Sequence, residues 1–166
     1  VAATLKGDVY HGVGLHSVDH GPTKRGTADV VAWLRGLWAD LDWADPVAHK
    51  ATGLPPDEAA CWTILDECGL TPSVVVHSGY GLQAYWLFPE PLDVRRRRKE
   101  LAALSVAWQG HLGAVAGDRG WKVDGTHDLA RVLRLPGSSN CKGPEPIPCR
   151  VLRDATDRYA VEAFAA

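Results

Sequence analysis

The 166-residue chain has no apolar run close to the roughly 20 residues that a membrane-spanning helix requires. A signal-peptide pattern is also missing, because no basic start followed by an apolar stretch occurs in the first residues. The chain contains no methionine at all. We therefore expect a protein that does not enter the membrane, and we interpret the sequence as a fragment of a longer chain.

A strong excess of positive charge is lacking as well. The 18 Lys and Arg residues are balanced by 20 Asp and Glu residues, which gives a net charge of −2. This balance excludes a protein that coats nucleic acid with its whole surface, so any such contact must use a local patch. The one dense basic run, at residues 95–99, is interpreted as the solvated face of a helix.

The cysteines contain no C-x-x-C pair, so a zinc ribbon is not expected. The four are Cys61, Cys68, Cys141 and Cys149. Reduced thiols of a cytoplasmic protein explain them most simply. Three histidines near the start, His11, His16 and His20, have irregular spacing and are interpreted as surface or loop residues.

The apolar pattern predicts a single domain over residues 1–166 in the α+β class, because strands and helices mix without strict βαβ alternation. Strands are expected at residues 9–13, 37–43, 73–77, 82–88 and 121–124, with a closing hairpin from 151–152 and 159–161. Helices are expected at residues 27–35, 55–68 and 94–115, and residues 129–135 should form a short helix or turn.

Two carboxylates, Asp40 and Asp42, lie inside the apolar and aromatic run at residues 37–43. In a strand their side chains point to the same face, where they repel each other unless a cation lies between them. Oxygen ligands of this kind suit Mg²⁺ or Mn²⁺. The alternative is a strand edge at which both carboxylates are solvated.

A glycine-rich turn at residues 78–81 joins two predicted strands into a hairpin. In the second strand Gln83 and Tyr85 share one face, and they follow two glycines that allow close approach to the backbone. Consecutive N–H groups in such a turn can bind phosphate. An ordinary glycine hairpin with an amphipathic strand is the alternative interpretation.

A third segment begins with Asp124, which ends a predicted apolar strand. If the residues after it are helical, Arg131 and Arg134 face the same side. Together with Lys142, which follows a tight turn, they would make a strong phosphate site. Alternatively, Arg134 pairs with a carboxylate at the edge of the core.

In this order the three segments resemble the signatures of the primase-polymerase branch of the archaeo-eukaryotic primase (AEP) superfamily. Those signatures are D-x-D, S-G-x-G-x-H, and a hydrophobic-Asp pair followed by R-x-x-R-x-P-G-x-x-N-x-K. Here they read Asp40-Leu41-Asp42, Ser78-Gly79-Tyr80-Gly81-Leu82-Gln83, and Val123-Asp124 with Arg131, Arg134, Asn140 and Lys142. The match extends from residue 9 to about residue 152. One position departs from the family, because Gln83 replaces a histidine that contacts the triphosphate and its amide carries no charge.

The resemblance implies an AEP-like catalytic core of two packed α/β modules, one of them with a sheet like that of the RNA-recognition motif. It implies that Asp40, Asp42 and Asp124 are the catalytic residues and hold two Mg²⁺ or Mn²⁺ ions, with Asp128 as an alternative to Asp124. The nucleotide-binding residues it implies are Ser78, Gly79, Gly81, Gln83, Tyr85, Arg131, Arg134, Asn140 and Lys142.

The implied function is that of a template-directed nucleotidyltransferase, a DNA primase, a DNA polymerase or both, in DNA replication or repair. Its partners would be template and primer DNA and nucleoside triphosphates, and such domains often stand beside a helicase domain. The expected setting is the cytoplasm of a prokaryote, in plasmid or phage replication. One alternative is a catalytically weakened module of the same fold that binds nucleotide or nucleic acid. A glycosyltransferase using D-x-D with Mn²⁺ is another, but it leaves Asp124 and the Arg/Lys cluster unexplained.

Overall fold

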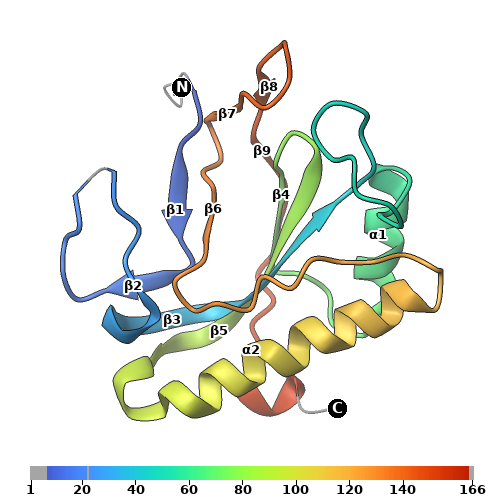
Figure 1. Ribbon diagram of the computed structural model, residues 1–166. Helices are drawn as coiled ribbons and strands as arrows, with labels where there is room; N and C mark the ends of the chain where they lie inside the picture. The colour runs from blue at the N-terminus through green and yellow to red at the C-terminus, as the bar shows by residue number, and fades with distance from the viewer. Residues whose placement is uncertain (1–6, 22, 165–166) are drawn as a thin grey trace.

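Two long antiparallel strands, β3 and β5, form the centre of the protein in the computed structural model, which describes residues 7–21 and 23–164 (Figure 1). They belong to a five-stranded sheet with the order β2-β3-β5-β4-β9, in which every neighbouring pair is antiparallel. The strands are β2 (Gly14–His16), β3 (Val31–Asp42), β4 (Val74–His77), β5 (Gly81–Asp93) and β9 (Arg150–Asp154). The hairpin predicted from the turn at residues 78–81 is therefore confirmed as β4–β5.

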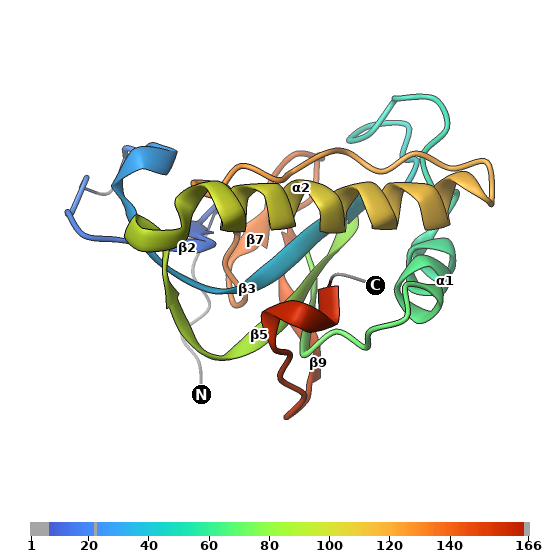
Figure 2. The same cartoon turned by 90° about the horizontal axis from the view of Figure 1, so that it is seen from below.

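Helices cover one face of this sheet, and two short strand pairs lie on the other side. Figures 1 and 2 show α2 (Val94–Gly117) running along the sheet, and α1 (Glu58–Glu67) lies near the C-terminal end of α2. The strand pairs are β1 (Tyr10–Gly12) with β6 (Val132–Arg134), and β7 (Ser139–Asn140) with β8 (Ile147–Pro148). Two short 3-10 helices, η1 (Ala28–Val30) and η2 (Val161–Phe164), complete the elements. The α+β class is confirmed.

Local sequence explains where both helices begin. The Asp57 carboxylate accepts a hydrogen bond from the N–H of Ala60 at 2.9 Å, which caps α1 directly after two prolines. Asp93 does the same for α2, with the N–H of Arg95 at 3.0 Å. Within the described part of the chain, neither helix is both long and apolar enough to span a membrane.

The alternation of residues in β5 separates the core from the site. Leu82, Ala84, Trp86 and Phe88 are buried in the core. The indole of Trp86 meets that of Trp108 from α2 edge to face, with ring centroids 4.9 Å apart. Gln83 and Tyr85, one residue out of phase, point to the opposite face. This is the division predicted from the sequence.

The helix predicted at residues 27–35 is wrong, because only η1 is helical and β3 already begins at Val31. The first half of β3 pairs with β2 and with the far end of β5, where Leu34 lies opposite Leu92. Long-range pairing therefore overrides the local pattern. At Gly36 a Cβ would lie 2.3 Å from the carbonyl oxygen of Trp86, so this irregular point of the strand requires glycine.

Three other predicted elements differ as well. Residues 121–124 form no strand, and residues 129–135, predicted as a short helix or turn, form a turn at residues 129–130 followed by the strand β6. The closing hairpin is also wrong: β9 pairs with β4, and the segment around Tyr159 forms no strand. Tyr159 instead donates its N–H to the carbonyl of Leu87 at 2.9 Å and packs its ring against Phe164.

Candidate active site

Asp40 and Asp42 lie at the end of β3, directly opposite Gln83 and Gly81 of β5. They line a small cavity of about 90 Å³ between the sheet and the segment of β6 and β7. Its other polar or charged lining residues are Tyr10, His49, Ser78, Gln83, Arg134, Asn140 and Lys142. The structure thus brings residues from all three sequence motifs into one pocket.

Burial raises the pKa of both carboxyl groups. The pKa of Asp40 rises to about 7, first through burial and then through the charge of Asp42, while the Gln83 side chain offsets part of the shift. The pKa of Asp42 rises to about 6, mainly through burial, against the opposing charge of Lys142. A carboxylate pair in this setting needs positive charge nearby in order to ionise at neutral pH.

Two buried side-chain oxygens of the pocket, Oδ1 of Asp40 and Oε1 of Gln83, have no hydrogen-bond partner in the part of the chain that the structure describes. Oxygen ligands are the type that Mg²⁺ and Mn²⁺ prefer, and a cation beside Asp40 would also reduce its repulsion with Asp42. The pocket therefore fits a divalent cation. Among residues 7–21 and 23–164, however, no group of three or more His, Cys, Asp or Glu side chains is already gathered as a metal site.

The two candidates for a third carboxylate differ in their surroundings. Asp124 is exposed and does not line the pocket, but its charge adds to burial in raising the pKa of Asp42 and opposes the lowering of the His49 pKa by burial. Asp128 forms an ion pair with Arg25 at 2.7 Å. Asp128 is thus engaged elsewhere, whereas Asp124 acts electrostatically on the site. That Asp124 binds metal stays a prediction.

The glycines of the hairpin make room for two site side chains. At Gly79, where φ is +106°, a Cβ would lie 2.6 Å from Cβ of Asn140, whose amide donates to the Ser78 carbonyl at 2.7 Å. At Gly81 a Cβ would lie 2.6 Å from Oδ1 of Asp42. Both glycines therefore allow close packing against residues of the pocket.

Two of the expected phosphate-binding N–H groups of this turn are used within the protein. The N–H of Ser78 donates to the Gly81 carbonyl at 2.9 Å, and the N–H of Gly79 donates to Nδ1 of His77 at 3.1 Å. These two groups are thus not free for a phosphate. Ser78 nevertheless lines the pocket.

Arg134 has the carboxylate partner that the alternative interpretation required. It is 5% exposed and forms an ion pair with Asp8, and its guanidinium carbon lies 5.0 Å from the ring centroid of Tyr10. It also lines the pocket, so the ion pair does not remove it from the site. The helix on which the shared side of Arg131 and Arg134 was predicated is absent, because Arg131 directly precedes the strand β6. Arg131 does not line the pocket.

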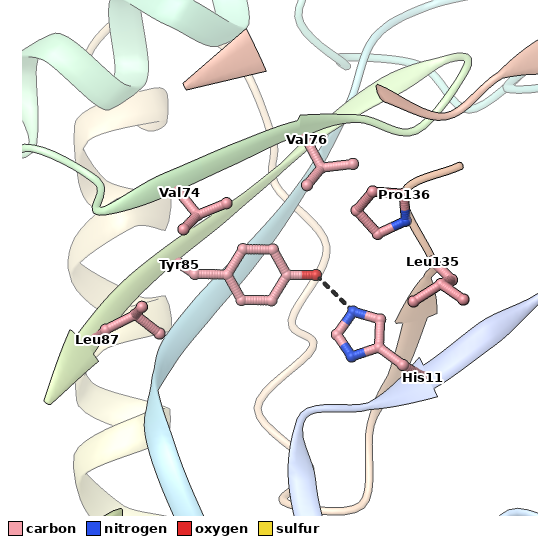
Figure 3. A pocket seen from close by; sticks show the side chains of 7 residues that line it. All are labelled: His11, Val74, Val76, Tyr85, Leu87, Leu135 and Pro136. Carbon is pink, nitrogen blue, oxygen red and sulfur yellow. Dashed lines mark hydrogen bonds between the residues drawn. The ribbon is translucent and has the colours of Figure 1, made fainter. Parts of the chain in front are cut away.

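Tyr85 lies beside the polar pocket, in an adjacent cavity of about 270 Å³ (Figure 3). The lining there is mostly apolar and consists of His11, Val74, Val76, Tyr85, Leu87, Leu135 and Pro136. The hydroxyl of Tyr85 and Nε2 of His11 are hydrogen-bonded at 3.1 Å, and burial raises the pKa of Tyr85. His11, expected at the surface or in a loop, is half-buried in β1. Tyr85 thus faces a cavity with few groups for a phosphate.

His49 is a residue of the pocket that the sequence reasoning missed. It lies in the loop between β3 and α1, where no motif or periodicity marks it. Its Nδ1 is 2.8 Å from Oδ2 of Asp42, and its Nε2 is 3.1 Å from Nζ of Lys142. The position seven residues after Asp42 was the one available signal, and distance along the chain alone does not identify a contact.

The fold is similar to that of a solved viral protein. The AEP domain of the primase-polymerase (PrimPol) of cyanophage S-2L matches with a TM-score of 0.62 and 20% sequence identity, covering 95% of this chain and 68% of that one. No protein-family model and no curated protein matches the chain. At this identity the likeness concerns the fold, and it confirms the AEP-like architecture that the three motifs predicted.

Proposed function

We propose that this chain, which has the AEP fold, is a template-directed nucleotidyltransferase that acts as a DNA primase, a DNA polymerase or both. One observation carries the proposal: the half-buried Asp40–Asp42 pair shares its pocket with Arg134 and Lys142, and one Asp40 carboxylate oxygen has no hydrogen-bond partner within residues 7–21 and 23–164. Carboxylates for cations and cations for phosphates are the two requirements of a metal–triphosphate site.

The reaction would be in-line attack of a primer 3′-hydroxyl on the α-phosphate of a nucleoside triphosphate. Two Mg²⁺ or Mn²⁺ ions held by Asp40, Asp42 and Asp124 would activate the attacking oxygen and stabilise the leaving pyrophosphate. Arg134 binds phosphate oxygens through its planar guanidinium, already oriented by Asp8 and Tyr10.

Three further groups contribute to the proposed nucleotide site. Lys142 supplies a second positive charge, and its N–H is held by the Asn140 side chain at 3.1 Å. Gln83 offers its amide from the floor of the pocket, at the position where the family has histidine. The uncharged amide favours a second candidate, a module of the same fold that binds nucleotide without catalysis. Such a module has no need of a half-buried carboxylate pair whose pKa values are raised by burial.

The partners proposed with this function are template and primer DNA, nucleoside triphosphates, and a helicase domain in a longer chain. The proposed setting is replication or repair of a plasmid-type or phage-type element in the cytoplasm.

A primer-extension assay with labelled nucleoside triphosphates and Mg²⁺ or Mn²⁺ tests the proposal. We expect Asp40→Ala and Asp42→Ala to abolish incorporation while circular dichroism shows an intact fold, and Asp124→Ala to do the same. Asp128→Ala should retain activity, because Asp128 is paired with Arg25. Asp66→Ala, at an exposed position of α1, is the matched control. Incorporation that survives in Asp40→Ala or Asp42→Ala would refute the two-metal assignment.

A further inference from the structure

The loop between β3 and α1 holds the imidazole of His49 in a defined place. The Asp45 and His49 backbones exchange two hydrogen bonds, at 3.0 and 3.1 Å, and the Asp45 carboxylate accepts two more from the N–H groups of Val47 and Ala48. The ring is 8% exposed and lies beside Tyr80, with the two centroids 6.2 Å apart. A side chain held on so tight a turn can orient the groups that it contacts.

The two contacts of His49 determine which ring nitrogen carries the proton. The ammonium of Lys142 has no lone pair and can only donate, so Nε2 must accept from it at 3.1 Å. The proton of the neutral ring then lies on Nδ1, which donates to Asp42 at 2.8 Å. One tautomer therefore satisfies both neighbours.

We propose that His49 is a positioning residue that links the metal side and the triphosphate side of the site. It fixes the Asp42 carboxylate toward the bound cation, and it holds the Lys142 ammonium at the pocket in readiness for a phosphate. This inference rests on the proposed function. It assigns to a loop histidine a role that none of the three motifs contains.

The first test observes the tautomer directly. Besides His11, whose Nδ1 lies 3.3 Å from the Gly12 carbonyl oxygen, one ring should carry its proton on Nδ1 in a long-range ¹H–¹⁵N spectrum of the intact chain with ¹⁵N-labelled histidine. His49→Gln should remove that signal and so identify it. A His49 signal with the proton on Nε2 would overturn the proposal, because Nε2 could then not accept from Lys142.

The second test separates the two contacts by binding measurements. His49→Ala should weaken both Mn²⁺ binding without nucleotide, followed by electron paramagnetic resonance, and binding of a fluorescent triphosphate. Each loss should be about tenfold or more, as is typical when the partner of a metal ligand is removed. His49→Asn places an amide donor near the position of Nδ1, so it should restore Mn²⁺ binding and leave triphosphate binding weak. His127→Ala, at an exposed position, is the control and should bind both ligands as wild type does.

The outcomes distinguish this inference from the proposed function. If wild type binds Mn²⁺ and triphosphate and extends a primer while His49→Ala matches it in both affinities, only the role of His49 is overturned. If wild type binds neither ligand, the proposed function fails and the role of His49 fails with it. An Asn variant that restores Mn²⁺ binding alone supports the proposal, and one that restores neither affinity overturns it.

Discussion

A Cβ atom at Gly81 would lie 2.6 Å from Oδ1 of Asp42, closer than real Cβ atoms approach any neighbour. The same atom would lie 2.7 Å from the carbonyl oxygen of Leu41, which cannot move as a side chain can. We therefore predict that Gly81→Ala displaces the Asp42 carboxylate and lowers Mn²⁺ affinity roughly tenfold or more. The free energy of unfolding should fall by about 1–3 kcal/mol because of the crowding.

Isothermal titration calorimetry with Mn²⁺ and urea unfolding measure the two effects of Gly81→Ala. Gly113→Ala is the matched control: a Cβ at that position of α2 meets open space, so the substitution should leave Mn²⁺ affinity unchanged. If Gly81→Ala binds Mn²⁺ as tightly as wild type does, the glycine is not required to position the Asp42 carboxylate.

Asp40 should make the stability of the metal-free protein depend on pH. Because its pKa rises from 3.8 to about 7 on folding, the folded state binds the proton more tightly than the unfolded state. The free energy of unfolding therefore falls as the pH rises between these values. The side chain of Asp40→Asn cannot ionise. The free energy of unfolding of this variant should therefore equal that of wild type near about pH 4 and be larger by roughly 2–4 kcal/mol above about pH 7.

Urea unfolding in the presence of a chelator, at several pH values, tests the prediction for Asp40→Asn. If the difference in free energy of unfolding between Asp40→Asn and wild type does not grow with pH, the prediction is contradicted. Added Mn²⁺ should then stabilise wild type and leave Asp40→Asn nearly unchanged, because the ligand is lost.

Arg134 and Lys142 should matter for the triphosphate more than for DNA. Arg134→Lys keeps the charge but loses the planar group that pairs with Asp8 and stacks on Tyr10, so we expect triphosphate affinity to fall about tenfold. Lys142→Ala should lower the triphosphate affinity by a similar factor. Both variants should bind template DNA as wild type does. Fluorescence anisotropy with labelled triphosphate and labelled DNA measures both affinities. Equal losses for DNA and triphosphate in Lys142→Ala would assign the cluster to the wrong ligand.

Gln83 permits a test by gain of function. It is 3% exposed, lies opposite Asp40 and lines the pocket, so it sits at the site and not against α2. We predict that Gln83→His tightens triphosphate binding, because a protonated imidazole adds charge where the amide has none. Mn²⁺ affinity measured without nucleotide should change little. Weaker triphosphate binding in Gln83→His would indicate that the amide itself is required.

Within the basic run at residues 95–99, Arg98 has a structural role that the expected solvated helix face did not include. Its guanidinium donates to the carbonyls of Ala28, Asp29 and Val31, and so ties α2 to the start of β3. We predict that Arg98→Ala lowers the free energy of unfolding by about 1–3 kcal/mol. Arg96→Ala should have little effect, since that side chain is 88% exposed. Urea unfolding of both variants tests this prediction, and equal stabilities would contradict it.

The features predictable from sequence were those with a local cause. Alternation with a period of two identified the buried and the site-facing sides of β5, and the glycines identified its turn. The D-x-D pair at Asp40 was recognisable because two carboxylates inside an apolar strand are costly without a ligand. These local patterns were sufficient to place the carboxylates and Gln83 in one pocket.

The features missed depend on partners far away in the chain. The segment at residues 27–35 becomes largely strand because β2 and the end of β5 pair with it. Arg131 was misplaced because a helical spacing was assumed for residues 131–134, and residues 132–134 instead form a strand that pairs with β1. His49 was missed because its contact is with Lys142, which lies 93 positions later in the chain. No local pattern contains such a contact.

The pairing of β9 with β4 also has a consequence during synthesis on the ribosome. Val74, Val75 and Val76 form three consecutive β-branched positions of β4, and β9 covers their outer edge from residues 150–154. Until that last strand has left the exit tunnel, a nascent chain that has folded its other strands exposes this edge. Exposed apolar edges pair readily with other chains. While β4 and β5 have emerged from the ribosome and β9 has not, the uncovered edge of β4 therefore favours aggregation and chaperone binding.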